Sequence, residues 1–105
     1  MSERMIKYKR VLKTLALCSP DTARGIIKKG EDDFILAILD AVWTTLDGRV
    51  SLLPAHLDKI RSMQSVLRQF ASRGLSVSQR KRILLKKQNG IRAIQTVFKA
   101  IKNQF

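Results

Sequence analysis

Side chains that perform catalysis are scarce in this sequence. Its 105 residues include one cysteine, Cys18, and one histidine, His56. A lone cysteine can form neither an internal disulfide nor a zinc site built on several cysteines, so we expect a reducing compartment. A hydrolytic site needs a nucleophile, a base and a group that orients them, and His56 stands alone in a helix start of ordinary composition. We therefore expect no catalytic residue, no metal and no cofactor, and predict that the protein is not an enzyme.

The sequence also lacks a glycine-rich phosphate-binding loop and a clear cation site. The five glycines are scattered along the chain, and all but Gly25 follow segments that read as helices, so no phosphate-binding loop is present. Glu31, Asp32 and Asp33 form a run of acids that could bind a cation. Acids at a helix N-terminus also interact favourably with the helix dipole without any ligand. We interpret this run as a helix start.

No apolar run is long enough to cross a membrane. The longest, Phe34 to Leu39, is far shorter than the roughly 20 residues that a spanning helix needs. The first ten residues lack the apolar core of a secretory signal. We expect an intracellular protein that is neither secreted nor transmembrane.

Acidic residues are missing from the later part of the chain. The 21 lysines and arginines outnumber the eight aspartates and glutamates, which gives a formal net charge of +13. The last acid is Asp58, so the eleven cations of residues 61–105 have no acid among them. Solvated helix faces usually mix both signs, and this imbalance therefore predicts a polyanionic partner. Charge alone leaves DNA, RNA and an anionic membrane as candidates.

The sequence does contain strong helical periodicity with defined boundaries. Ser19 with Pro20, and Ser76 with Gln79, are typical of helix starts. No segment alternates apolar and polar residues, and neither repeats nor a low-complexity linker are present. We predict a single all-α domain over residues 1–105, built as a compact bundle of five or six short helices. The predicted helices are 3–17, 20–29, 33–47, 54–72, 77–88 and about 91–103.

Two of these helices have unusual apolar patterns. The segment 33–47 is apolar on nearly all sides, with Ile38 and Val42 in its main stripe and Trp43 outside it. Such a helix is normally central, and its apolar excess suggests a homo-oligomer. The amphipathic segment 91–103 has three possible roles: a core helix, a self-association helix, or a helix on a membrane surface that attracts its cationic side.

The densest cluster of cations is the stretch SQRKRILLKKQNG, from Ser78 to Gly90. Its cations are interrupted by Ile83, Leu84 and Leu85. On a helix these apolar residues contribute to a narrow seam that would hold the segment on the domain, with cations on both flanks. Such cations bind phosphates with strong salt dependence and little sequence preference. The alternative is a solvated helix face. The stretch also suits a nuclear-import signal, which would not exclude binding.

We therefore predict a protein that binds double-stranded nucleic acid without sequence specificity, as in the condensing or packaging of DNA. Aromatic residues are sparse in the basic half, which argues against stacking on single-stranded bases. The sequence leaves DNA versus RNA open. The predicted phosphate contacts are Arg73, Arg80, Lys81, Arg82, Lys86, Lys87 and Arg92, with secondary contacts from Lys7, Lys9, Arg10 and Lys13.

Two other functions fit the same residues. The helices predicted at 54–72 and 77–88 could form a helix-turn-helix with the second as the reader. That helix lacks pairs of Asn or Gln spaced for base edges before Gln88, so a sequence-specific regulator is the second hypothesis. The third is a structural protein whose basic surface docks on an acidic protein partner.

The chain between about residues 11 and 90 resembles a family of small basic proteins of Polinton/Maverick-type mobile elements and adintovirus-like double-stranded DNA viruses. The shared outline is a Leu-x-x-Leu pair before Ser-Pro, an Ile-Ile pair, an aspartate before an apolar helix that ends in Leu-x-Gly, a Pro-started helix, and a serine before a basic-leucine run. These positions are Leu12, Leu15, Ser19, Pro20, Ile26, Ile27, Asp33, Leu46, Gly48, Pro54, Ser76 and Arg80 to Leu85. The resemblance implies an accessory or core component of a virion that binds packaged double-stranded DNA.

Overall fold

The described part of the chain folds entirely into helices. In the computed structural model, residues 2–48, 52–87 and 89–101 are described, and they contain eight α-helices and no strand. The all-α class is confirmed, and the expected number of five or six helices is too low. The helices are α1 (Glu3–Lys7), α2 (Lys9–Leu17), α3 (Pro20–Lys29), α4 (Asp32–Leu46), α5 (Pro54–Ser62), α6 (Gln64–Ala71), α7 (Val77–Lys86) and α8 (Gly90–Ile101).

The number differs because two predicted helices are each broken at one residue. Tyr8 separates α1 from α2 with φ −100° and ψ 14°, and Met63 separates α5 from α6 with φ −112° and ψ 14°. The breaks let successive segments reach different partners: α1 packs on α4 while α2 packs on α8, and α6 packs on α4 and α7 as well as on α8. The spacing of apolar residues is the same on both sides of each break, so periodicity alone predicted continuous helices.

The predicted helix starts are confirmed in detail. The Ser19 hydroxyl accepts a hydrogen bond from the Thr22 backbone N–H, and Pro20 occupies the first position of α3. Ser76 and Gln79 form a capping box, in which each side chain accepts a hydrogen bond from the other residue's backbone N–H. These caps fix where α3 and α7 begin, and α7 carries most of the predicted basic surface.

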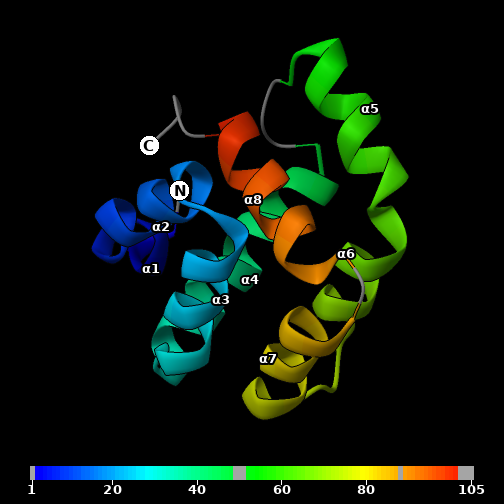
Figure 1. The fold of residues 1–105 in the computed structure, drawn as a ribbon. Helices are drawn as coiled ribbons and strands as arrows, with labels where there is room; N and C mark the ends of the chain where they lie inside the picture. Colours follow the sequence, from blue (N-terminus) through cyan, green and yellow to red (C-terminus); the bar gives the residue numbers. More distant parts are fainter. Residues whose placement is uncertain (1, 49–51, 88, 102–105) are drawn as a thin grey trace.

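The centre of the molecule is α8. It packs against α2, α3, α4, α5, α6 and α7, and Figure 1 shows it between the N-terminal helices on one side and α5 and α6 on the other. Its apolar side is buried, with Ile94, Val97 and Phe98 fully enclosed. The core role therefore describes the predicted segment 91–103 as far as Ile101, and residues 102–105 lie outside the described residues.

The apolar helix α4 shares this core with α8. Ile35, Ile38 and Val42 are buried, and α4 packs against α1, α6, α7 and α8. Trp43 stays 40% exposed, and its indole N–H donates to the Ala71 carbonyl at 3.0 Å. Because the chain itself covers most of α4, the apolar excess of this helix no longer gives a reason for the expected homo-oligomer.

Candidate nucleic-acid interface

Helix α7 lies on the body of the protein along the predicted apolar seam. Leu84 is buried, and Val77, Ile83 and Leu85 are partly buried against the core. The helix packs on α3, α4, α6 and α8. Its basic residues are consequently held on a fixed surface, and burial sorts them into three groups.

Arg80 requires a correction, because it is a buried residue rather than a surface cation. The residue is 6% exposed, and its Nη1 donates a hydrogen bond to the Phe70 carbonyl near the end of α6. Burial lowers the pKa of the Arg80 guanidinium. The spacing of Val77, Arg80 and Leu84, at i, i+3 and i+7, places Arg80 on the seam, and this signal was present in the sequence. Arg80 therefore joins α7 to α6 and is not available to a phosphate.

Lys81 and Arg82, the next two residues on α7, also differ from each other in burial. The Lys81 ammonium group donates to the Gly30 carbonyl at 2.8 Å, so Lys81 is partly buried and ties α7 to the end of α3. Arg82 is exposed on α7, and Arg73 is exposed in the turn before it. Arg73 and Arg82 thus remain accessible members of the predicted set.

The junction of α7 and α8 brings together the last three members of the set, Lys86, Lys87 and Arg92. Asn89 has φ 66°, a left-handed conformation that asparagine tolerates better than most residues, and the Gly90 N–H donates to the Lys87 carbonyl at 3.1 Å. A Cβ atom on Gly90 would lie 2.5 Å from the Leu84 carbonyl oxygen. Glycine therefore lets the start of α8 press against the last turn of α7.

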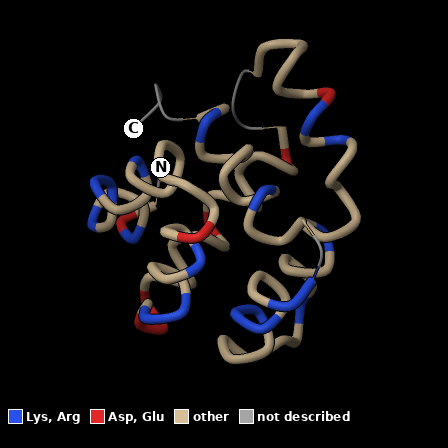
Figure 2. The backbone as a smooth tube through the Cα atoms, viewed as in Figure 1, with Lys and Arg blue, Asp and Glu red and all other residues tan. Residues whose placement is uncertain are grey.

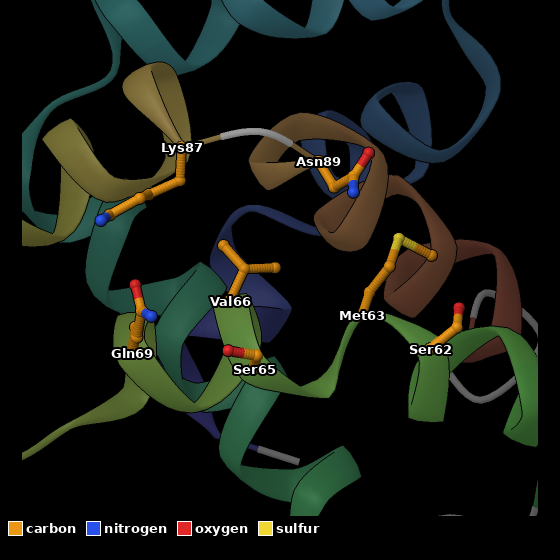
Figure 3. A pocket seen from close by; sticks show the side chains of 7 residues that line it. All are labelled: Ser62, Met63, Ser65, Val66, Gln69, Lys87 and Asn89. Atoms are coloured by element: carbon orange, nitrogen blue, oxygen red, sulfur yellow. The ribbon is translucent and has the colours of Figure 1, made fainter.

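Three adjoining hollows meet at Asn89, and together we call them the Asn89 groove. The α6 hollow, which α6 lines with Ser65, Val66 and Gln69, has a volume of about 270 Å³. The α3 hollow, which α3 lines with Pro20, Asp21 and Arg24, has a volume of about 410 Å³. The α5 hollow, which α5 lines with Lys59 and Ser62, has a volume of about 660 Å³. All three share Asn89, and the α3 and α5 hollows also share Pro20 and Arg92. Figure 3 shows the α6 hollow, with residues from the α5–α6 break and α6 on one wall and Lys87 and Asn89 on the other.

The walls of the Asn89 groove are strongly cationic. Six lysines and arginines line it together with one carboxylate, that of Asp21. Arg24 is fixed in place, because its Nη1 donates to the Leu85 carbonyl at 2.7 Å. The six cations are Arg24, Lys59, Lys86, Lys87, Arg92 and Lys99.

Half of these cations were outside the predicted contacts. Arg24 and Lys59 belong to parts of the chain that also contain acids, so the local charge did not mark them. They reach the groove only because α3 and α5 both pack on α8. Lys99 was identifiable from the acid-free half, where it lies on the polar side of α8.

Comparisons with protein-family models, curated proteins and solved structures gave no significant match for this chain. The chemistry of the groove is therefore argued from its own residues. Among the residues that the structure describes, no three His, Cys, Asp or Glu side chains are grouped so as to hold a metal ion. No described helix combines the length and the apolar character needed to cross a membrane.

The predicted secondary contacts form a separate face. Figure 2 shows the cations of α1 and α2 on the side of the molecule away from those of α5 to α7. Lys7 is ion-paired with Asp33 at 3.0 Å, and this hydrogen bond raises the pKa of Lys7 and lowers that of Asp33. Lys9 and Arg10 are exposed on α2, and Lys13 is partly buried. Lys9 and Arg10 are thus the exposed cations of this face that form no ion pair in the described structure.

Proposed function

We propose that this protein binds double-stranded nucleic acid without sequence specificity, and that the Asn89 groove is its principal contact. The observation that carries the proposal is the excess of six cations over one carboxylate in a single hollowed surface. The phosphates of a nucleic-acid backbone are attracted to such a surface, and the release of their counterions drives binding. Arg73 and Arg82, exposed beside α7, extend the positive surface beyond the groove.

Hydrogen bonds within the fold engage two of the amides near the cations, which supports binding without base reading. Gln79 is engaged in the capping box of α7. The Gln95 amide donates to the Leu15 and Cys18 carbonyls at 3.1 and 2.8 Å, which ties α8 to the end of α2. Bidentate contacts to adenine need a free Asn or Gln side chain, and the engagement of Gln79 and Gln95 within the fold supports a surface that contacts phosphates.

The same observations weaken the helix-turn-helix alternative. Helices α6 and α7 do pack together across the turn at residues 72–76, as that motif requires. A reading helix, however, presents its first turns to the base edges. On α7, Gln79 is engaged in a cap, Arg80 is buried and Lys81 is bonded to Gly30.

A packaging role is the biological form of this proposal. A nonspecific surface suits a protein that coats or condenses DNA, and the sequence resemblance to small basic proteins of double-stranded DNA viruses and mobile elements points the same way. The proposed setting is accordingly the nucleus or a virion. Membrane-surface contact by α8 has less support, because the apolar side of this helix faces the core.

A pair of variants with equal charge tests the location of the contact. Lys87→Gln with Arg92→Gln removes two groove cations, whereas Lys28→Gln with Lys29→Gln removes two exposed cations from the end of α3 outside the groove. We expect the first pair to weaken duplex DNA binding about tenfold at moderate salt and the second to change it little. Fluorescence anisotropy with duplexes of unrelated sequence measures both effects.

The other hypotheses predict different results in this experiment. A preference for one duplex that persists as the salt concentration rises would support a regulator. Equal losses in the two double variants would move the contact away from the groove. If no duplex binds even at low salt, the proposal is wrong and an acidic protein partner takes its place.

A further inference from the structure

The α3 hollow is lined by more cations than either of the other two hollows of the groove. Four cations line it, from three different helices or their ends: Arg24, Lys86, Lys87 and Arg92. Arg24 reaches it from α3 and is held there by its bond to the Leu85 carbonyl. A guanidinium group has five N–H donors, so that bond leaves others free for a ligand.

Backbone donors add to these side chains. The α3 hollow is lined by Ile91 and Arg92 in the first turn of α8 and by Asp21 in the first turn of α3, and each of these residues has a backbone N–H. Amide groups in the first turn of a helix lack acceptors within the helix, and the helix dipole favours an anion there. The cations and the two helix starts thus favour the same ligand charge within a volume of about 410 Å³.

We infer that the α3 hollow is a binding site for a single phosphate group. A phosphate monoester carries close to two negative charges at neutral pH and offers three acceptor oxygens, which matches a cluster of four cations. The inference deepens the proposed function and rests on it for the source of the phosphate, the terminal phosphate of a polynucleotide. Asp21 is the single opposing charge in the hollow, and it limits the affinity for the phosphate.

Inorganic phosphate is the simplest probe of this site. Titrated against chloride at constant ionic strength, it should give saturable amide shifts at Asp21, Ile91 and Arg92 in ¹H–¹⁵N NMR spectra. Lys86→Gln removes a cation that lines the α3 hollow, and Lys99→Gln removes one that lines only the α5 hollow. We expect Lys86→Gln to weaken phosphate binding roughly fivefold and Lys99→Gln to leave it unchanged. Asp21→Asn should strengthen it by a similar factor.

Lys86 and Lys99 are both exposed, so neither substitution should impair folding. Shifts that rise linearly without saturation, or equal losses in both lysine variants, would overturn the inference. Duplex DNA titrated into the same proteins separates this result from the proposed function. Duplex binding without saturable phosphate binding sinks the phosphate site alone. Saturable phosphate binding without duplex binding sinks the proposed function, and the site then serves free phosphate.

Discussion

Arg80 and Arg82 lie two positions apart on α7 and have opposite surroundings. Arg80 is 6% exposed and bonded to the Phe70 carbonyl, whereas Arg82 is exposed. A buried carbonyl group that loses its hydrogen-bond donor stays desolvated, which destabilises the folded state. A hydrogen bond from a charged donor is also stronger than one from a neutral donor. One side chain therefore serves stability, and the other is free for a ligand.

We expect Arg80→Ala to lower the free energy of unfolding by about 1 to 3 kcal/mol, because it removes a buried charge-assisted bond. Arg82→Ala should change it by less than about 0.5 kcal/mol. Chemical denaturation measures both. Duplex affinity should show the reverse order, with the larger loss in Arg82→Ala. If Arg80→Ala kept full stability and lost affinity, its assignment as a structural residue would be wrong.

Two glycines make a matched test of the α7–α8 junction. A Cβ atom on Gly90 would meet the Leu84 carbonyl oxygen at 2.5 Å, whereas one on Gly25, within α3, would meet nothing within 4 Å. We expect Gly90→Ala to destabilise the protein by about 1 to 3 kcal/mol through overpacking. Gly25→Ala should stabilise it by roughly 0.5 to 1 kcal/mol, as alanine does inside helices. Thermal unfolding of the two variants compares them, and a stable Gly90→Ala would contradict the described junction.

The helices show which parts of the fold can be predicted from sequence. Local signals such as Ser19 with Pro20 and Ser76 with Gln79 act within one turn, and the helices they start were predicted within a residue or two. The breaks at Tyr8 and at the α5–α6 boundary depend on distant partners. The ring centroids of Tyr8 and of Phe34 on α4, for example, lie 5.4 Å apart. A sequence read along one helix contains no such partner, so these breaks were missed.

The contact between α1 and α4 includes ion pairs that pH can break. In the described part of the chain, Lys7 and Arg4 of α1 pair with Asp33 at the start of α4. The hydrogen bond from Lys7 holds the pKa of the Asp33 carboxyl below its ordinary value. A lowered carboxyl pKa contributes stability that is complete above the ordinary aspartate pKa of about 4 and is lost as pH falls through the lowered value.

We therefore expect Asp33→Asn to lower the melting temperature at pH 6 and to have a progressively smaller effect as the pH falls below the ordinary aspartate pKa of about 4. As the wild-type carboxyl becomes protonated, it comes to resemble the amide. Asp32→Asn is the control, because Asp32 shares the first turn of α4 but takes no part in these pairs. Melting curves followed by circular dichroism give the comparison. A difference between wild type and Asp33→Asn that stays constant as the pH falls from 6 to well below 4 would exclude the ion pairs as its cause.

At the scale of the molecule, the excess of cations could be predicted from the sequence, but their positions relative to one another in the fold could not. Lys86, Lys87 and Arg92 of the acid-free half are close in sequence, and they line the same hollow. Arg24 is bonded to Leu85 across 61 positions of the chain, and no local pattern anticipates that contact. The groove is a product of packing around α8, which joins cations from four helices and the α7–α8 turn into one surface.

The number of cations in the groove sets the salt dependence of the proposed binding. Each neutralised phosphate contributes roughly −0.9 to the slope of log K against log salt, so the six cations limit the groove's share to about −5. We expect Lys87→Gln with Arg92→Gln to make the slope shallower by about 2, and Lys28→Gln with Lys29→Gln to leave it unchanged. Duplex titrations between low and moderate salt provide the slopes. A wild-type slope much steeper than about −5 would show that the α1–α2 face also contacts the duplex. Identical slopes in the two double variants would show that phosphates are neutralised outside the groove.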